Sequence, residues 1–160
     1  MKKSVLLLFF AGCVATGIFG IGRKIPMNRV NDLGQREGYW RDSVGGGFVY
    51  DLYYKGGKKD GLYKRFYRNK LFLFGEYTAD NISGTWYMFG DEGELRCTID
   101  SIELNKDSIY TGYCRIFCKY KCHSIDYYPS GAVKSEGYMV CDEEFEIEIW
   151  EIGEWKYYDE

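Results

Sequence analysis

The chain of 160 residues is poor in proline and histidine, with only 2 prolines and 1 histidine. A single imidazole, that of His123, argues against histidine-based catalysis and against a histidine-rich metal site. No segment after Gly22 repeats apolar residues at the three- and four-residue spacing of an amphipathic helix. The net charge is only −3, which argues against general electrostatic attraction to nucleic acid. The sequence therefore predicts neither a helical bundle nor a nucleic-acid-binding protein.

Aromatic residues and glycine, by contrast, are abundant, with 16 Tyr, 10 Phe, 4 Trp and 20 Gly. Aromatic side chains favour pleated, half-buried surfaces, and glycine permits tight turns. Residues 48–55 alternate in the two-residue period of a strand. Further strands are expected at 63–67, 71–77, 86–89 and 95–99, separated by turns at 56–61, 69–70, 80–84 and 90–93. The pattern predicts an all-β fold of antiparallel hairpins.

A glycine followed two residues later by an aromatic residue recurs along the chain. The glycines are Gly38, Gly61, Gly84 and Gly153, and the first three lie 23 residues apart. The aromatic residues are Trp40, Tyr63, Trp86 and Trp155. A period in the twenties is typical of repeat proteins, in which each hairpin needs neighbours to bury its aromatic face. We therefore expect the four aromatic residues to pack between repeats; an exposed ladder that binds sugar or peptide is the less favoured interpretation.

Four segments combine glycine with an aromatic residue, namely 34–40, 57–63, 75–77 and 128–137, and two of them also contain lysine. They resemble the repeat of MORN-repeat variants in bacterial proteins, including the YwqK-type antitoxin family. The resemblance covers most of residues 28–160. It implies an elongated sheet of stacked antiparallel β-hairpins that serves as an interaction scaffold and contains no catalytic residues.

Residues 1–24 have the features of a signal peptide, a lipoprotein signal or a membrane anchor. Two lysines precede an uncharged run at residues 4–22. The sequence Phe-Ala-Gly-Cys at 10–13 resembles a bacterial lipobox, in which Cys13 would be lipidated. Alternatively, the run is about long enough to cross the roughly 30 Å core of a bilayer as a helix. We expect attachment to a membrane of the cell envelope and favour the lipoprotein slightly over a single-pass anchor.

The remainder of the chain, residues 25–160, is expected to form one domain of MORN-like hairpin repeats. Clear repeat units lie near 38–60, 61–83, 84–99 and 127–160, whereas residues 100–126 are degenerate. The degenerate segment is rich in cysteine.

Five cysteines follow the N-terminal segment: Cys97, Cys114, Cys118, Cys122 and Cys141. Three of them, with the adjacent His123, have a spacing that a structural zinc site permits. In a strand, however, residues four apart lie about 13 Å from one another, too far to share a metal or a disulfide. We therefore expect no metal and no cofactor, and buried thiols rather than partial pairing across neighbouring strands.

Charge is distributed unevenly, with +5 over residues 41–75 and −8 over residues 141–160. Three acidic residues that alternate with apolar ones form a candidate interaction face: Glu144, Glu146 and Glu148. A solvated sheet edge is the simpler explanation for them.

These observations predict a non-enzymatic, membrane-attached repeat module that mediates protein–protein interaction in the bacterial cell envelope. One alternative is an antitoxin-like or immunity-like protein that neutralises a partner toxin. A second is a small carbohydrate-active or hydrolytic enzyme that uses exposed carboxylates.

Overall fold

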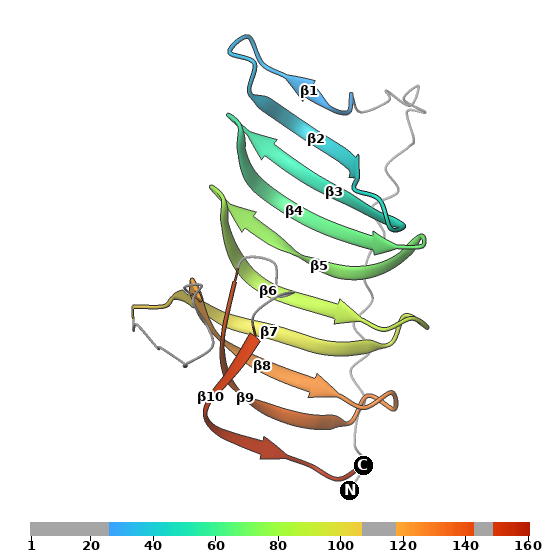
Figure 1. Ribbon diagram of the computed structural model, residues 1–160, viewed down its shortest axis with the longest axis vertical. Coiled ribbons are helices and arrows are strands. Elements are labelled where there is room, and N and C mark those ends of the chain that lie inside the picture. The colour runs from blue at the N-terminus through green and yellow to red at the C-terminus, as the bar shows by residue number, and fades with distance from the viewer. Residues whose placement is uncertain (1–25, 107–117, 143–148) are drawn as a thin grey trace, which may run out of the picture.

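The computed structural model describes residues 26–106, 118–142 and 149–160. It confirms an all-β fold of antiparallel hairpins: ten strands form one open sheet in chain order (Figure 1). The strands are β1 (Arg29–Val30), β2 (Arg36–Ser43), β3 (Phe48–Lys55), β4 (Lys58–Tyr67), β5 (Lys70–Thr78), β6 (Asn81–Phe89), β7 (Leu95–Leu104), β8 (Tyr120–Tyr127), β9 (Val133–Cys141) and β10 (Ile149–Tyr157). The described part of the chain contains no helix long and apolar enough to cross a membrane.

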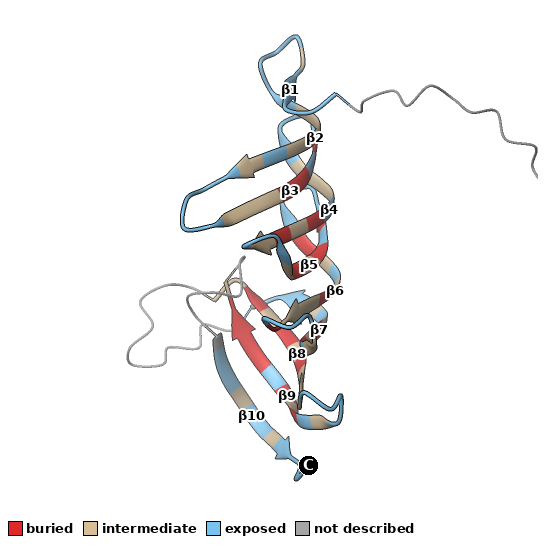
Figure 2. Ribbon diagram, turned by 90° about the vertical axis from the view of Figure 1, so that its right-hand side faces the viewer, coloured by how far each residue is buried: buried red, intermediate tan, exposed pale blue. Residues whose placement is uncertain are grey.

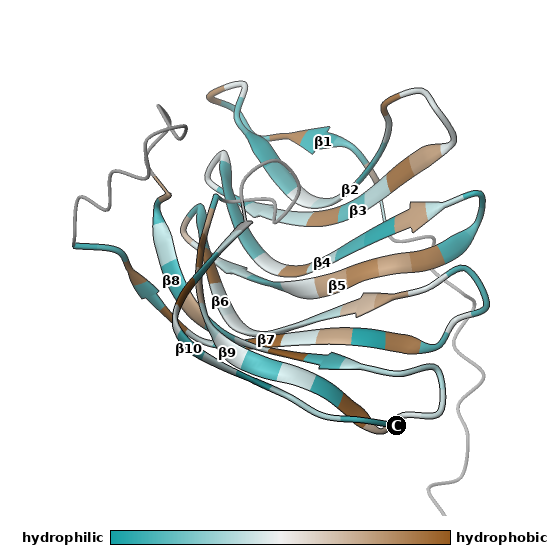
Figure 3. Cartoon of the chain, turned by 60° about the horizontal axis from the view of Figure 1, so that its bottom comes forward, coloured by the Kyte–Doolittle hydropathy of each residue, from teal (hydrophilic) through white to brown (hydrophobic). Residues whose placement is uncertain are grey.

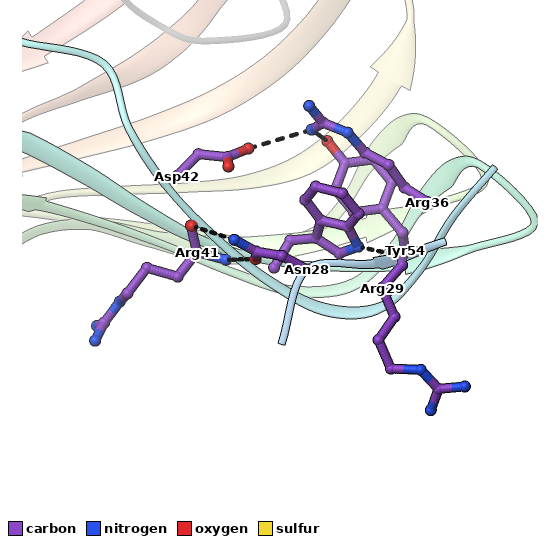
Figure 4. Close-up of polar contacts among 7 residues, drawn as sticks. Asn28, Arg29, Arg36, Arg41, Asp42 and Tyr54 are labelled. Carbon is purple, nitrogen blue, oxygen red and sulfur yellow. Dashed lines mark hydrogen bonds and ion pairs between the residues drawn. The ribbon is translucent and has the colours of Figure 1, made fainter. Parts of the chain in front are cut away.

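The strands are strongly bent, so the sheet forms a trough rather than a flat layer (Figure 3). Arg36 and Asp42 lie six residues apart in β2, yet their side chains meet at 3.2 Å. The Cα atoms of such residues lie about 20 Å apart in a straight strand. The two side chains can meet only because both project from the concave side of a bent strand (Figure 4).

The core lies on this concave face. Trp40 pairs across the strands with Leu52, Leu52 with Tyr63, and Trp86 with Ile99. Trp86 is fully buried, and its ring lies 5.5 Å from that of Tyr63 and 5.3 Å from that of Tyr77. Each of β3 to β9 contains at least two buried residues, and the described residues of β1, β2 and β10 include none (Figure 2). The sheet therefore bends around its own aromatic core.

Of the four repeat aromatics, two are buried and two are at the margins of the core. Tyr63 and Trp86 are 6% and 0% exposed. Trp40 and Trp155 are partly buried and pack against the same cluster. The difference follows from position, because Trp40 and Trp155 lie near the two ends of the sheet.

The repeat glycines bend the strands. Gly61, Gly84 and Gly153 each lie where three consecutive residues of one strand face a single residue of its neighbour. Their φ angles of 121°, 66° and 70° are costly for residues with a side chain. Such bulges kink a strand and increase its twist. The period of 23 residues therefore marks a regularly repeated kink.

Two of the four predicted turns are shorter than expected. We expected turns at 56–61 and 80–84, but Gly61 and Gly84 lie inside β4 and β6. Three hairpins instead turn on two residues that both have positive φ: Gly56-Gly57, Arg68-Asn69 and Ala79-Asp80. This geometry matches the right-handed twist of the flanking strands.

The segment expected to be degenerate, residues 100–126, is described only at its two ends. Its described flanks belong to β7 and β8, which pair with each other and continue the meander. The kink in β7 falls at Ser101, whose φ is 51°. Ser101 has a positive φ like the repeat glycines, but it is not their counterpart, because those glycines lie in β4, β6 and β10, which run antiparallel to β7.

Candidate binding site

Side chains on the concave face become smaller from the N-terminal to the C-terminal part of the sheet. One row of cross-strand neighbours consists of Tyr50, Arg65, Leu73, Met88, Cys97, Asp126 and Ser135. In a second row, Trp86 and Ile99 are followed by Ser124 and Gly137. Bulky residues thus fill the trough as far as β6, and small ones leave space over β8 and β9.

That space is a hollow of about 470 Å³. Its apolar lining includes Phe72, Met88, Phe89, Ile99, Met139 and Trp155, and its charged lining is Asp91, Arg96, Asp126, Lys134 and Glu151. Trp155 covers Gly137 so closely that a Cβ at this glycine would lie 2.5 Å from the indole ring. The indole Nε1 donates a hydrogen bond to the carbonyl of Tyr138 at 2.9 Å. We refer to this space as the hollow.

Three one-residue bulges add side chains to the concave face. The extra residues are Phe72 in β5, Arg96 in β7 and Lys134 in β9, and each precedes a member of the first row. A bulge redirects the side chain of the inserted residue, and all three line the hollow. The same type of one-residue bulge therefore places an aromatic ring on the concave face in β5 and a cation on that face in β7 and in β9.

The cations of the two parts of the trough differ in how they are covered. Arg65 in β4 is 6% exposed, with its guanidinium 4.3 Å from the ring centroid of Phe48. The Arg36 guanidinium lies 4.5 Å from the Trp40 ring and donates a hydrogen bond to the Tyr54 hydroxyl at 2.9 Å (Figure 4). These aromatic faces attract and shield the charge.

Arg96 and Lys134 are exposed, as Arg36 is, but no aromatic ring in the described part of the chain lies against either cation. Among the described residues, neither side chain takes part in an ion pair, a hydrogen bond or a cation–π contact, although the Lys134 carbonyl accepts a hydrogen bond from the Tyr158 N–H. Both also line an adjoining hollow of about 260 Å³ that extends to Tyr128 and Pro129. The C-terminal trough therefore presents two accessible cations beside an apolar floor.

Two carboxylates in the hollow are held by hydroxyl groups. Ser135 Oγ donates to Asp126 at 3.0 Å, and the Tyr157 hydroxyl donates to Glu151 at 2.9 Å. The hydrogen bond to Glu151 raises the pKa of Tyr157. Burial raises the pKa of Cys97, which also lines the hollow, to about 12. Because the thiolate is the nucleophile, Cys97 is inert at neutral pH.

The other residues singled out in the sequence do not join the hollow. His123 points away from Cys122 because neighbouring side chains of a strand alternate between faces, and its ring stacks edge-on against Tyr138 at 5.3 Å. The described residues include no group of three or more metal-ligating side chains. Cys13, Glu144, Glu146 and Glu148 lie outside the described residues.

The hollow was not predicted, because its lining comes from strands dispersed over more than 80 residues. The sequence feature that indicates the hollow is a basic residue, Arg96 in β7 and Lys134 in β9, at the bulge position that Phe72 occupies in β5. No protein-family model, curated protein or solved structure matches the chain.

Proposed function

We propose that this protein is a non-enzymatic module of the bacterial cell envelope whose hollow accepts a segment of a partner protein. The observation that supports it is the pair of accessible cations, Arg96 and Lys134, beside an apolar floor. Binding sites are typically concave and apolar, with a few polar groups that fix the orientation of the ligand. Here the cations and the two anchored carboxylates provide both signs of charge.

The length of the site favours a polypeptide over a compact small molecule. The hollow and its smaller neighbour share Arg96, Tyr127 and Lys134. Together they extend from the floor of the trough to the turn between β8 and β9. An extended segment can follow this path and place its own charged side chains against residues of both signs.

The chemistry of the hollow supports binding rather than catalysis. Its thiol, that of Cys97, is buried and protonated at neutral pH. The sole histidine faces the opposite side of the sheet, where its Nδ1 lies 3.4 Å from Asp100. A histidine-activated nucleophile therefore does not form among the described residues of the hollow.

The site is tested by charge reversal. The double variant R96E/K134E in the full chain should reduce recovery of the partner from native membranes by about ten-fold, because reversed charges repel a complementary segment. The matched control, K55E/K58E, makes the same change in charge at exposed residues of the hairpin between β3 and β4. Equal recovery with both double variants would refute the proposal.

Attachment to the membrane forms the second part of the proposal and rests on residues 1–24. Lipidation of Cys13 predicts that a fatty-acid label enters the wild type and is lost in Cys13→Ser. Retention in the membrane without any label would instead show an uncleaved helix.

Two more specific alternative functions would use the same hollow. An antitoxin-like or immunity-like function, which rests on the family resemblance, would make the partner a toxin. A carbohydrate-active enzyme is favoured by the presence of Asp126, Glu151 and Trp155 in one hollow, because paired carboxylates and an aromatic platform are typical of glycosidases. Glycoside hydrolysis that is abolished by Asp126→Asn would establish the enzyme.

A further inference from the structure

Two buried thiols face each other on neighbouring strands. Cys122 of β8 and Cys141 of β9 are both 0% exposed, and their Sγ atoms lie 3.4 Å apart. Cys122 pairs across the strands with Met139, and Cys141 with Tyr120, so the two cysteines are diagonal neighbours on the concave face. Long side chains at diagonal positions are within reach of one another.

The folded sheet encloses both thiols completely. The contact with Cys122, followed by burial, raises the pKa of Cys141 well above its usual range. Because thiol–disulfide exchange requires a thiolate and access to the oxidant, the folded sheet protects the pair from reaction. Covalent pairing must therefore precede the closure of β9 over β8, or follow a local opening of these strands.

We propose that Cys122 and Cys141 form a disulfide that links β8 to β9 in the oxidised protein. One thiolate attacks the sulfur of a disulfide oxidant, such as a low-molecular-weight disulfide, and releases one thiol of that oxidant. The second thiolate then attacks the mixed disulfide and releases the other thiol. Two protein thiols are thus oxidised to one disulfide, the oxidant is reduced to two thiols, and the protein's protons are transferred to them.

The geometry selects this pair over the other described cysteines. An S–S bond is about 2.05 Å long, so the two Sγ atoms need to approach by roughly 1.4 Å. The Cα atoms of diagonal neighbours lie about 7–8 Å apart, just beyond the usual range for a disulfide, so β8 and β9 also need to move slightly closer at this point. The Sγ atom of Cys97, by comparison, contacts Ser124 Oγ at 3.2 Å. Cys118 contributes to the electrostatic environment of Cys141 and is the competing partner.

The disulfide would stabilise the wall of the hollow. Cys122 lies two residues from Ser124, and Cys141 two residues from Met139, and both of these residues line the hollow. A bond between β8 and β9 at this point closes a loop of about twenty residues in the unfolded chain. The inference does not depend on the proposed function, since it concerns the sheet alone.

Tryptic mapping distinguishes all pairings, because lysine and arginine place the six cysteines on six different peptides. The full chain is unfolded and refolded with a mixture of oxidised and reduced glutathione, treated with iodoacetamide and digested without reductant. We expect residues 122–134 and 135–156 to appear as one linked pair with a mass two hydrogens below their sum. Reduction should abolish this species.

The variants provide the controls. Cys122→Ala and Cys141→Ala should each abolish the linked pair, whereas Cys97→Ala should retain it. In the wild type, oxidation should raise the melting temperature by about 5–10 °C relative to the reduced chain, a comparison that requires no substitution. Linkage of residues 116–119 to either peptide instead, or alkylation of both thiols after oxidative refolding, would overturn the proposal.

Discussion

The concave faces of β2 to β6 and of β7 to β10 are built on the same bent hairpins but present different surfaces. In the first part, the aromatic rings of Tyr63, Tyr77 and Trp86 contact one another and fill the trough. In the second, Ser124 and Gly137 occupy the corresponding row and leave the hollow. The backbone kinks are shared, so the size of the side chain decides whether a stretch of the sheet is filled core or open site.

The two parts also differ in the surroundings of their charged side chains. Arg65 is enclosed by aromatic rings, whereas Arg96 and Lys134 project beside the hollow from equivalent bulges. Substitution alone can therefore turn a filled repeat into an open one, without any change in its hairpins. The following predictions test this comparison between the two parts.

The largest effect is expected for the two core tryptophans. Trp86→Ala should lower the free energy of unfolding by about 3–5 kcal/mol, since a fully buried ring leaves a cavity. Trp155→Ala should cost only about 1–2 kcal/mol, because Trp155 is partly exposed on an edge strand. Chemical denaturation measures both values. Equal losses of unfolding free energy in the two variants would contradict the interpretation that the concave face is filled in β2 to β6 and open in β7 to β10.

The glycines beneath these rings give the next comparison. A Cβ at Gly75 would lie 2.1 Å from Trp86, and one at Gly137 would lie 2.5 Å from Trp155. Gly75→Ala should cost about 3 kcal/mol, because the enclosed Trp86 ring cannot move away. Gly137→Ala should cost about 1 kcal/mol, because Trp155 can shift toward solvent. A larger loss for Gly137→Ala, measured by denaturant unfolding, would reverse the assignment of the two parts.

A reciprocal exchange tests the kinks themselves. Gly84 in β6 and Ser101 in β7 both have positive φ, of 66° and 51°. Gly84→Ser should destabilise by about 1 kcal/mol, whereas Ser101→Gly should stabilise the protein by somewhat less, because glycine also gains entropy in the unfolded chain. Thermal melts would detect both shifts. Destabilisation by Ser101→Gly would show that serine makes a contact there that offsets its strain.

The smallest effect concerns the attachment of β10 and depends on pH. Glu136 of β9 accepts hydrogen bonds from Lys156 Nζ at 2.9 Å and from the Tyr158 hydroxyl at 2.7 Å. These contacts lower the pKa of Glu136 from its ordinary value of 4.5. The resulting stabilisation is complete above pH 4.5 and is lost as the pH falls through the lowered pKa of the folded state.

The stability difference between wild type and Glu136→Gln should therefore be larger at pH 7 than at pH 3. Urea unfolding at the two pH values measures this small difference. An equal stability difference at pH 7 and at pH 3 would show that the ionised Glu136 carboxylate does not stabilise the attachment of β10.

The sequence predicted the sheet well because its main signal is local. The alternation of residues 48–55 and the glycine–aromatic spacing are enough to predict the strands and their repetition. The kink of β7 was not predicted, because nothing in the sequence marks Ser101 as a residue with a positive φ. The hollow escaped prediction because one-residue bulges, and not the alternation, direct Arg96 and Lys134 to its lining.

The cysteines are a second case in which the local sequence pattern does not predict a contact between strands. The spacing of Cys114, Cys118 and Cys122 drew attention to neighbours along the chain. The contact of Cys122, however, is with Cys141, 19 residues away on the adjacent strand. Such a pair is defined by the register of β8 against β9, which only the folded sheet supplies.

Site-specific photo-crosslinking in native membranes tests most directly the claim that the partner binds the hollow and not the convex face. A photoreactive phenylalanine replaces either Tyr127, which lines the hollow, or Tyr53, which is 48% exposed and points away from the concave face. We predict one defined protein adduct from position 127 and none from position 53. An adduct from position 53 alone, or none from either position, would contradict the claim.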